Sequence, residues 1–254
     1  MMTETETTSE STTGQRTLVT LCTYNERENI ELLLPEIWQH LPEAHILVVD
    51  DNSPDGTGEY VASLQPTHPN LHLLQRAGKL GLGTATVAAF QYGIDNGFDL
   101  LANLDADFSH PPRFLPALVA GVNSFDVAIG SRYVPGGKVD GWGWGRHFMS
   151  RSINVYARLM LGLSTKDNSG SFRCYRVNKL AEFDWSKSRA KGYAFQEEIL
   201  FRLKNVGCTF TEVPIHFEER RFGHTKISWK EAVSAGIVLF QLRLESFLPG
   251  QSRK

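Results

Sequence analysis

Asp99-Leu-Leu-Ala-Asn-Leu-Asp-Ala-Asp107 is a short apolar run that ends in two carboxylates two residues apart. An apolar run of this length favours a buried strand, here over 99–104. Similar runs occur before and after it, and stretches with helically spaced apolar residues separate them. This alternation is typical of an α/β fold with a mainly parallel sheet and helices on both faces. The predicted strands cover 18–22, 45–50, 71–75, 99–104, 125–130 and 209–213.

The predicted helices fill the gaps between these strands and continue past the last of them. They cover 28–40, 57–64, 84–96, the stretch after Pro112, 146–161, 194–205 and the chain from about Ser228. There is no internal repeat and no linker, so we predict one domain over 16–254, with halves at about 16–133 and 134–254. Residues 1–15 are almost all Thr, Ser and Glu, which predicts a disordered tail.

Composition limits the classes of protein to which the chain can belong. Its 254 residues are 41% hydrophobic and 21% charged, as in an ordinary soluble globular protein. The net charge of -2 gives no overall attraction to nucleic acid, so we predict no nucleic-acid partner. The apolar run over 232–240 is much shorter than the roughly 20 residues of a membrane span. Three widely spaced cysteines predict reduced thiols in a cytosolic protein.

Polar side chains follow four of the predicted strands. They form the segments Tyr24-Asn-Glu26, Asp50-Asp51, Asp105-Ala-Asp107 and Ser131-Arg132. Because the carboxyl ends of parallel strands meet at one edge of a sheet, and ligands bind beyond that edge, these segments predict a single active site.

The pair Asp105 and Asp107 predicts a metal site. Two carboxylates at a strand end can both reach a hard cation such as Mg²⁺ or Mn²⁺, which prefers oxygen ligands. Such a cation would neutralise charge that develops on a diphosphate leaving group. The alternative is that the two aspartates cap the helix after Pro112.

The first two strand ends offer groups for a nucleoside. The Tyr24 ring could stack on a base, and the carboxylates of Glu26 and Asp51 could accept hydrogen bonds from a base or ribose. The alternatives are local: Glu26 could cap the next helix, and Asp50 and Asp51 begin a run of turn-forming residues.

Four cations in loops or at helix starts, namely Arg132, Arg146, Arg220 and Lys226, predict binding of a polyanion. The loop that leads to Arg146 is rich in Gly and holds Trp142 and Trp144, which could meet a membrane interface or pack in the core. The stretch 136–150 and one stripe of the C-terminal helix are therefore the candidate membrane-facing surfaces. The stripe consists of Val233, Ile237, Phe240 and Leu244.

Taken together, these motifs resemble the dolichol-phosphate (polyprenol-phosphate) mannosyltransferases, which are family 2 glycosyltransferases of GT-A fold. The resemblance covers about 17–228. It rests on the segments Thr23-Tyr-Asn-Glu-Arg-Glu-Asn29, Val48-Val-Asp-Asp-Asn-Ser-Pro-Asp-Gly-Thr57, Lys79-Leu-Gly-Leu-Gly-Thr-Ala85, Asp105-Ala-Asp-Phe-Ser-His-Pro111, Gly130-Ser-Arg-Tyr133, Gly170-Ser-Phe-Arg173, Gly192-Tyr-Ala-Phe-Gln196 and Glu212-Val-Pro-Ile215.

The resemblance implies a role for individual residues. Those that would bind the donor are Tyr24, Glu26, Val49, Asp51, Asp105, Ala106, Asp107, Arg220 and Lys226. The metal would lie on Asp105, Asp107 and Ser109, and the acceptor phosphate on Arg132, Arg146 and Ser150. The residues implied in catalysis are Asp105, Asp107, Arg132 and Arg220. Gln196 and Glu198 match positions of the family, without a chemical role that we can assign.

The implied reaction transfers mannose from GDP-mannose to dolichyl or polyprenyl phosphate with inversion, and it depends on Mg²⁺ or Mn²⁺. The first half of the chain, about 16–133, would bind the nucleotide-sugar, and the second half, about 134–254, the acceptor. The resemblance also implies a cytoplasmic protein, peripheral at the cytoplasmic face of the membrane, with a possible small membrane subunit. Two alternatives remain open: UDP-glucose or another nucleotide-sugar as donor, and a catalytically inactive nucleotide-sugar-binding subunit.

Overall fold

The computed structural model describes residues 14–188, 194–220 and 229–245. Its strands are β1 (Thr17–Thr23), β2 (His45–Asp50), β3 (Leu71–Gln75), β4 (Leu100–Asp105), β5 (Val127–Ser131), β6 (Lys138–Val139), β7 (Arg173–Arg176), β8 (Phe210–Pro214) and β9 (His216–Phe217). Most of the predicted tail, residues 1–13, lies outside the described residues, and so does Lys226.

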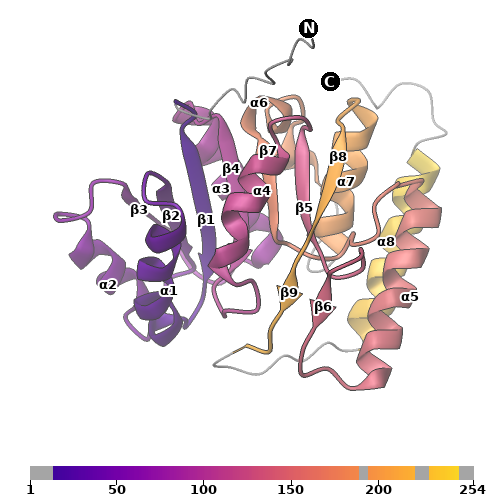
Figure 1. Ribbon diagram of the computed structural model, residues 1–254, viewed down its shortest axis with the longest axis horizontal. Coiled ribbons are helices and arrows are strands. Elements are labelled where there is room, and N and C mark those ends of the chain that lie inside the picture. The colour runs from indigo at the N-terminus through magenta and orange to yellow at the C-terminus, as the bar shows by residue number, and fades with distance from the viewer. Residues whose placement is uncertain (1–13, 189–193, 221–228, 246–254) are drawn as a thin grey trace, which may run out of the picture.

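The helices alternate with the strands as predicted (Figure 1). They are α1 (Arg27–His40), α2 (Thr57–Leu64), α3 (Leu82–Asp95), α4 (Leu115–Gly121), α5 (Trp144–Leu161), α6 (Val177–Leu180), α7 (Ala194–Asn205) and α8 (Trp229–Glu245), with 3₁₀ turns η1 (Pro112–Phe114) and η2 (Trp185–Lys187). Each predicted helix is present, with ends that differ by a few residues.

A seven-stranded sheet has the order β3-β2-β1-β4-β7-β5-β8. All of its pairings are parallel except those of β7, which runs antiparallel to both neighbours, so the predicted mainly parallel sheet is confirmed. Thr23 pairs with Asp50, and Cys22 pairs with Asp105. The carboxyl ends of the three strands β1, β2 and β4 are therefore level at one edge.

Helices cover both faces of the sheet, because neighbouring residues of each strand point to opposite sides. Leu18 of β1 packs in a core with α3, α5, α6, α7 and α8, whereas Val19 packs with α1, α2 and α4 on the other face. Both side chains are fully buried. This double cover explains why the strands are nearly continuous apolar runs.

Three turns at the carboxyl edge contain a residue in the left-handed region. Asn25 follows β1 with φ 60°, Asn52 follows β2 with φ 57°, and Phe108 follows β4 with φ 66°. Asparagine tolerates this conformation, whereas for phenylalanine it costs on the order of 1–3 kcal/mol. The turn at Phe108 directs the next residue, Ser109, back toward Asp107.

Beyond this edge, β6 and β9 form a small parallel sheet, at the bottom of Figure 1. Helices α5 and α8 pack side by side at the end of the molecule that bears β5 and β8 (Figure 1). Within the described residues, no helix combines the length and the apolar character that crossing a bilayer requires.

Candidate active site

Asp105 and Asp107 lie at the end of β4, and neither caps the turn that follows. The first residue of η1 receives no side-chain cap, so the capping alternative is not what the structure shows. Instead, Asp107 Oδ1 accepts hydrogen bonds from the Ser109 amide at 3.0 Å and from its hydroxyl at 2.6 Å. Asp105 Oδ1 accepts a hydrogen bond from the Ser171 hydroxyl at 2.7 Å. Both carboxylates are thus oriented before any ligand arrives.

This pair fits a hard divalent cation by its chemistry, because both donors are carboxylates and come from one strand end. Within the described residues, no group of three or more His, Cys, Asp or Glu side chains could hold a metal ion. A cation on Asp105 and Asp107 would therefore need further oxygen ligands from outside this residue set, such as a phosphate, water or the predicted Ser109. Ser109 lies against Asp107 as the predicted third ligand requires, but its hydroxyl is buried and donates to that carboxylate.

The buried His110 side chain supports the same strand end. Its Nδ1 accepts a hydrogen bond from the Asp105 amide at 3.1 Å, and its ring stacks on Phe172 with centroids 5.0 Å apart. Burial lowers the pKa of His110, against the opposing effect of Asp105 and Asp107. The imidazole is therefore neutral at physiological pH and acts as a spacer, not as a counter-charge to the two aspartates.

Asp50, the last residue of β2, and Asp51, which follows it, have different roles. Asp50 is fully buried and accepts hydrogen bonds from the Thr23 hydroxyl at 2.8 Å and from the Ser53 amide at 2.9 Å, so it builds the turn. Asp51 forms an ion pair with Arg76 at 2.8 Å and accepts a hydrogen bond from the Leu80 amide at 3.2 Å. The turn and the predicted ligand role of Asp51 are compatible, because the turn places Asp51 at the edge.

The other predicted donor residues are spread along the same edge. The Lys79 ammonium group lies over the Tyr24 ring, with Nζ 4.2 Å from the ring centroid. Glu26 makes no side-chain cap for α1 and accepts a hydrogen bond from Asn29 at 2.6 Å. Burial raises the pKa of Glu26, and the nearby Asp107 adds to this effect. Glu26 and Asp107 thus belong to one electrostatic site.

The two apolar residues among the predicted donor residues, Val49 and Ala106, are buried. Val49 packs in the core, and its backbone pairs with both Cys22 and Leu74. Ala106 is also buried, between the two metal-site aspartates in sequence. Any contact of Ala106 with a donor would come from its backbone, and a contact from Val49 stays a prediction.

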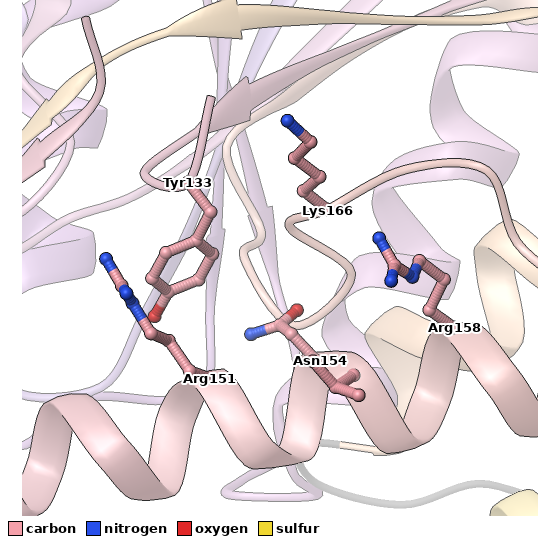
Figure 2. Close-up of a pocket in the computed structure, with 6 residues that line it drawn as sticks. Tyr133, Arg151, Asn154, Arg158 and Lys166 are labelled. Carbon is pink, nitrogen blue, oxygen red and sulfur yellow. The ribbon is translucent and has the colours of Figure 1, made fainter. Parts of the chain in front are cut away.

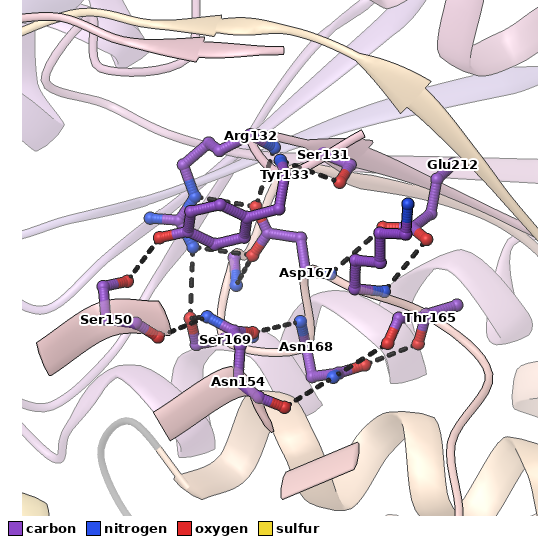
Figure 3. Close-up of polar contacts among 12 residues, drawn as sticks. Ser131, Arg132, Tyr133, Ser150, Asn154, Thr165, Asp167, Asn168, Ser169 and Glu212 are labelled. Carbon is purple, nitrogen blue, oxygen red and sulfur yellow. Dashed lines mark hydrogen bonds and ion pairs between the residues drawn. The ribbon is translucent and has the colours of Figure 1, made fainter. Parts of the chain in front are cut away.

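Arg132, at the end of β5, is held by Asp167 (Figure 3). Its Nε and Nη2 donate to the two Asp167 oxygens at 2.7 and 2.6 Å, and its amide donates to the same carboxylate at 2.9 Å. Burial works to raise the pKa of Asp167, but the Arg132 charge, the hydrogen bonds from Arg132 and the Arg173 charge together outweigh it, and the pKa lies below its ordinary range. The pair is therefore ionised, and the hydrogen bonds of the guanidinium to described residues come from Nε and Nη2 and not from Nη1.

The remaining predicted acceptor residues surround this guanidinium. Arg146 lies over the Trp142 ring, 4.1 Å from its centroid, and Arg132 lies 5.5 Å from the same ring. The Ser150 hydroxyl is 2.7 Å from the Tyr133 hydroxyl (Figure 3). Trp142 is thus half-buried inside the site, and of the two tryptophans only Trp144 projects into solvent, with 85% of its surface exposed.

Phe217 of β9 joins the two halves of the site. Its ring packs against His110 at 5.5 Å and Trp142 at 5.2 Å, and the Arg132 guanidinium lies 5.4 Å from its centroid. Directly after β9, the Glu218 amide donates a hydrogen bond to the Ser109 carbonyl. Two residues later, Arg220 Nη2 lies 3.0 Å from Asp107 Oδ2. The strand β9 therefore connects the predicted metal site with the predicted acceptor cations.

Sequence reasoning missed several residues of this site, namely His110, Asp167, Ser171 and Phe217. Asp167 belongs to the polar stretch 165–171, which has the composition of a surface loop yet is largely buried. The Glu212 carboxylate holds that loop in place, because it accepts hydrogen bonds from the backbone amides of Lys166 at 2.9 Å and Asp167 at 3.0 Å (Figure 3). The resemblance marked Ser171 and His110 within matching segments, and this was the available signal.

A second buried carboxyl group lies behind Arg132. Glu197 of α7 is buried, and burial raises its pKa to about 7, although the nearby Arg173 opposes this. Arg173 is itself fully buried and donates to the carbonyls of Gln196 at 2.8 Å and Asn168 at 2.7 Å. The interior therefore favours the neutral form of Glu197 below pH 7.

We expect Glu197→Gln to change how stability depends on pH. The folded protein binds the Glu197 proton more tightly than the unfolded chain, so ionisation destabilises the fold increasingly between about pH 4.5 and 7. Wild type and variant should be about equally stable at pH 4.5, and the variant more stable by about 3 kcal/mol at pH 8. Urea unfolding across this range measures the difference. A constant difference at every pH would contradict the assignment.

The chain is similar in sequence to known proteins over most of its length. The sequence model of Glycosyl transferase family 2 matches residues 18–183. The polyprenol monophosphomannose synthase of Mycolicibacterium smegmatis is 44% identical over 216 residues, which cover 84% of this chain and 82% of that protein. The undecaprenyl-phosphate mannosyltransferase of Micrococcus luteus is 42% identical over 213 residues, which cover 84% and 88%.

Solved structures resemble the fold at much lower sequence identity. Glucosyl-3-phosphoglycerate synthase from Mycobacterium tuberculosis, in complex with Mn²⁺, UDP and glucosyl-3-phosphoglycerate, has a TM-score of 0.60 at 17% identity, covering 94% of this chain and 82% of that one. A mannosyltransferase from Pyrobaculum calidifontis, in complex with GDP-Man and Mn²⁺, has a TM-score of 0.53 at 16% identity, covering 91% and 73%. At these identities the likeness concerns the fold alone.

Proposed function

Because this chain belongs to glycosyl transferase family 2, we propose that it transfers mannose from GDP-mannose to a polyprenyl phosphate. It is a glycosyltransferase with an α/β fold of the GT-A type. The observation that carries the proposal is the meeting of two oriented carboxylates, Asp105 and Asp107, with the cations Arg132 and Arg146 at one edge. The first pair suits a nucleoside diphosphate with its metal, and the second suits an acceptor phosphate.

In the proposed reaction, an oxygen of the lipid phosphate attacks the anomeric carbon of the donor sugar. The bond from that carbon to the diphosphate breaks on the opposite side, so the configuration inverts and a nucleoside diphosphate leaves. A phosphate monoester has a second pKa near 6 and is largely dianionic at neutral pH. It therefore needs no general base, which agrees with the neutral, buried His110.

The protein's own part is to position two anions that repel each other. Arg132 would bind the acceptor phosphate through Nη1 while Asp167 holds its other nitrogens, so the guanidinium is oriented and only part of its charge is available. Arg146 would bind from α5 across the Trp142 ring. A divalent cation on Asp105 and Asp107, when bound, would neutralise charge on the leaving diphosphate.

Release of nucleoside diphosphate tests this proposal. With GDP-mannose and Mn²⁺, we expect release to require a short-chain polyprenyl phosphate and to fall to the background rate without it. If nucleoside diphosphate is released from UDP-glucose and not from GDP-mannose, the alternative donor is correct and the proposed donor is wrong. No release with any donor, while GDP-mannose still binds, would favour an inactive nucleotide-sugar-binding subunit.

The ion pair between Arg220 and Asp107 predicts a change of partner when the donor binds. A cation held by Asp105 and Asp107 would compete with Arg220 for the Asp107 carboxylate, so Arg220 would leave it and be free to bind the donor phosphates. We expect Arg220→Ala to bind Mn²⁺ more tightly without nucleotide, and to bind GDP with Mn²⁺ roughly 10- to 100-fold more weakly. Electron paramagnetic resonance of Mn²⁺ and calorimetry with GDP measure the two effects.

Arg16→Ala is the matched control, because Arg16 lies at the opposite end of β1, where its side chain donates to the carbonyl of Asn96 at 2.9 Å. Both affinities should be unchanged in this control. Weaker binding of Mn²⁺ to Arg220→Ala in the absence of nucleotide would contradict the competition. Lys226, the other cation of this region that is predicted to bind the donor, lies outside the described residues.

We also propose that the protein binds the membrane surface peripherally, at the cytoplasmic face, where a polyprenyl phosphate presents its head group. Exposed apolar side chains on α5 support this, since Trp144 is 85% and Phe148 69% exposed. On the adjacent α8, the exposed residues Ile237, Phe240 and Leu244 continue the predicted stripe. A small membrane subunit stays a prediction.

We expect Trp144→Ala/Phe148→Ala to bind vesicles at least about tenfold more weakly than wild type. The variant lacks two large apolar side chains whose transfer from water into the bilayer favours binding. Flotation with neutral phosphatidylcholine vesicles containing polyprenyl phosphate measures this loss. Leu32→Ala, which removes an exposed apolar side chain of α1, is the control and should bind as wild type does. Unchanged flotation of the double variant would exclude this face of α5 as the docking surface.

A further inference from the structure

A pocket of about 230 Å³ opens beside the proposed acceptor site, between α5 and the loop that follows it (Figure 2). Its lining combines three cations, two neutral polar side chains and one apolar side chain. The lining residues are Arg151, Arg158, Lys166, Tyr133, Asn154 and Val155. In Figure 2, Arg158 and Lys166 lie on two sides of the hollow above Asn154, and Arg151 lies beyond the Tyr133 ring.

The pocket is positively charged. No acidic side chain lines it, and among the described residues none forms an ion pair with Arg151, Arg158 or Lys166. Arg132, by contrast, is paired with the buried Asp167. Three cations that form no ion pair with a described acidic side chain repel one another, although the Glu212 carboxylate binds the Lys166 amide nearby. An anion in the pocket would relieve that repulsion.

The floor and one wall of the pocket are fixed in place. Asn154 is buried, and its Nδ2 donates to the Ser150 carbonyl at 2.9 Å and to the Ser169 hydroxyl at 3.0 Å (Figure 3). The Tyr133 hydroxyl is 2.7 Å from Ser150 Oγ. The pocket therefore exists before a ligand binds, and it shares the Tyr133 wall with the proposed acceptor site while using other cations.

An exposed apolar face of α5 lies beside the pocket. Val155, which lines the pocket, is exposed, and Leu159 one turn later is 67% exposed. Trp144 and Phe148 extend this exposed apolar surface toward the start of the helix. A basic pocket that opens beside an exposed apolar helix face fits an anion whose apolar part lies in the same surface.

We propose that this pocket binds the phosphate of an anionic bilayer phospholipid, next to and separate from the acceptor phosphate. Arg158 and Lys166 bind the phosphate oxygens, Arg151 attracts the head group from beyond Tyr133, and the acyl chains follow Val155 and Leu159. The site would hold the enzyme on the bilayer in the orientation that brings Arg132 and Arg146 to a polyprenyl phosphate. It rests on the proposed function only for the identity of that neighbouring acceptor.

The test compares binding to vesicles that contain no polyprenyl phosphate, so it is read independently of transfer. We expect wild type to prefer vesicles with 20% phosphatidylglycerol over neutral phosphatidylcholine vesicles. Arg158→Gln/Lys166→Gln should reduce affinity for the anionic vesicles about 30-fold at low salt and leave neutral-vesicle binding unchanged. This fold-change corresponds to about 2 kcal/mol for two cations.

Two further variants separate the pocket from general charge. Lys179→Gln/Lys187→Gln removes the same charge from surface ion pairs with Glu182 and Asp184, and it should bind anionic vesicles as wild type does. Arg158→Lys/Lys166→Arg keeps the charge and should retain most of the affinity. Equal losses in the pocket variant and in the Lys179/Lys187 control would overturn the proposal.

Inorganic phosphate distinguishes a soluble ligand from a lipid. If phosphate titration by NMR shifts the resonances of 151–166 in wild type, and the pocket variant loses this response without any change in vesicle binding, the lipid assignment is overturned. Transfer to a water-soluble short-chain acceptor should be the same in wild type and in the pocket variant. Loss of that transfer would place Arg158 and Lys166 in the acceptor site and would also overturn the proposal.

Discussion

Replacing Asp107 with Asn should reduce transfer roughly 100- to 1,000-fold while the fold stays intact. The side chain keeps its volume and an oxygen for the Ser109 hydroxyl, which now donates at 2.6 Å. What is lost is the charge that a divalent cation needs on Oδ2, the oxygen that Arg220 now faces. Steady-state rates with saturating GDP-mannose, Mn²⁺ and short-chain polyprenyl phosphate measure the effect.

Asp95→Asn is the matched control, because Asp95 is exposed on α3 and its carboxylate accepts a hydrogen bond from Gln91 at the surface. It loses the same charge and should keep the wild-type rate. Equal circular dichroism spectra for the two variants would show that folding is not the cause. Near-normal metal-dependent transfer by Asp107→Asn would remove Asp107 from the proposed metal site.

Asp167→Asn should cost about 3–5 kcal/mol of folding free energy, which is the typical effect of removing one partner from a buried ion pair. Asp167 is fully buried and accepts hydrogen bonds from two side-chain nitrogens of Arg132 and from its amide. In the variant, the amide nitrogen of Asn faces the Arg132 donors, and the guanidinium charge has lost its partner. Thermal unfolding should shift by roughly 10 °C, given 2–4 °C per kcal/mol in a protein of this size.

A double variant separates stability from acceptor binding. Arg132→Met/Asp167→Leu removes both charges, and apolar pairs of similar volume are often as stable as the ion pair they replace. We expect it to regain part of the stability, because the buried charges are gone but the backbone amide of residue 132 has lost its acceptor. It should stay inactive, because the acceptor phosphate has lost the Arg132 Nη1 donor. Glu31→Gln, in the exposed pair with Arg27, is the surface control and should cost less than about 1 kcal/mol. Recovery of activity in the double variant would contradict the acceptor role of Arg132.

The sequence predicts the sheet well because the buried parallel strands and the amphipathic helices obey simple periodicities. It does not predict β7, whose four residues Arg173-Cys-Tyr-Arg176 begin and end with a cation. Burial of the strand is tolerated because backbone carbonyls of α7 and of the 165–171 loop accept hydrogen bonds from two of the Arg173 guanidinium nitrogens. Those carbonyls are distant in the sequence, and no local pattern marks them as partners.

The same limit applies to the candidate site. Asp105 and Asp107 are visible because they directly follow an apolar run, and the level strand ends place them near Glu26. Asp167 is hidden in a polar stretch, and its burial depends on meeting Arg132 across the fold. The sequence also left open whether Trp142 and Trp144 pack in the core or meet a membrane interface. The structure separates them, since the Trp142 ring packs against Phe217 and Trp144 is exposed.

Mass spectrometry of the lipid product tests the central claim most directly. The purified chain is incubated with Mn²⁺, a short-chain polyprenyl phosphate and, in separate reactions, GDP-mannose, UDP-glucose and UDP-N-acetylglucosamine. We predict that a polyprenyl phosphate heavier by one hexose forms with GDP-mannose alone, and that Asp107→Asn yields almost none. A hexosyl lipid formed only from UDP-glucose, or no glycosylated lipid from any donor, would contradict the proposed mannosyl transfer.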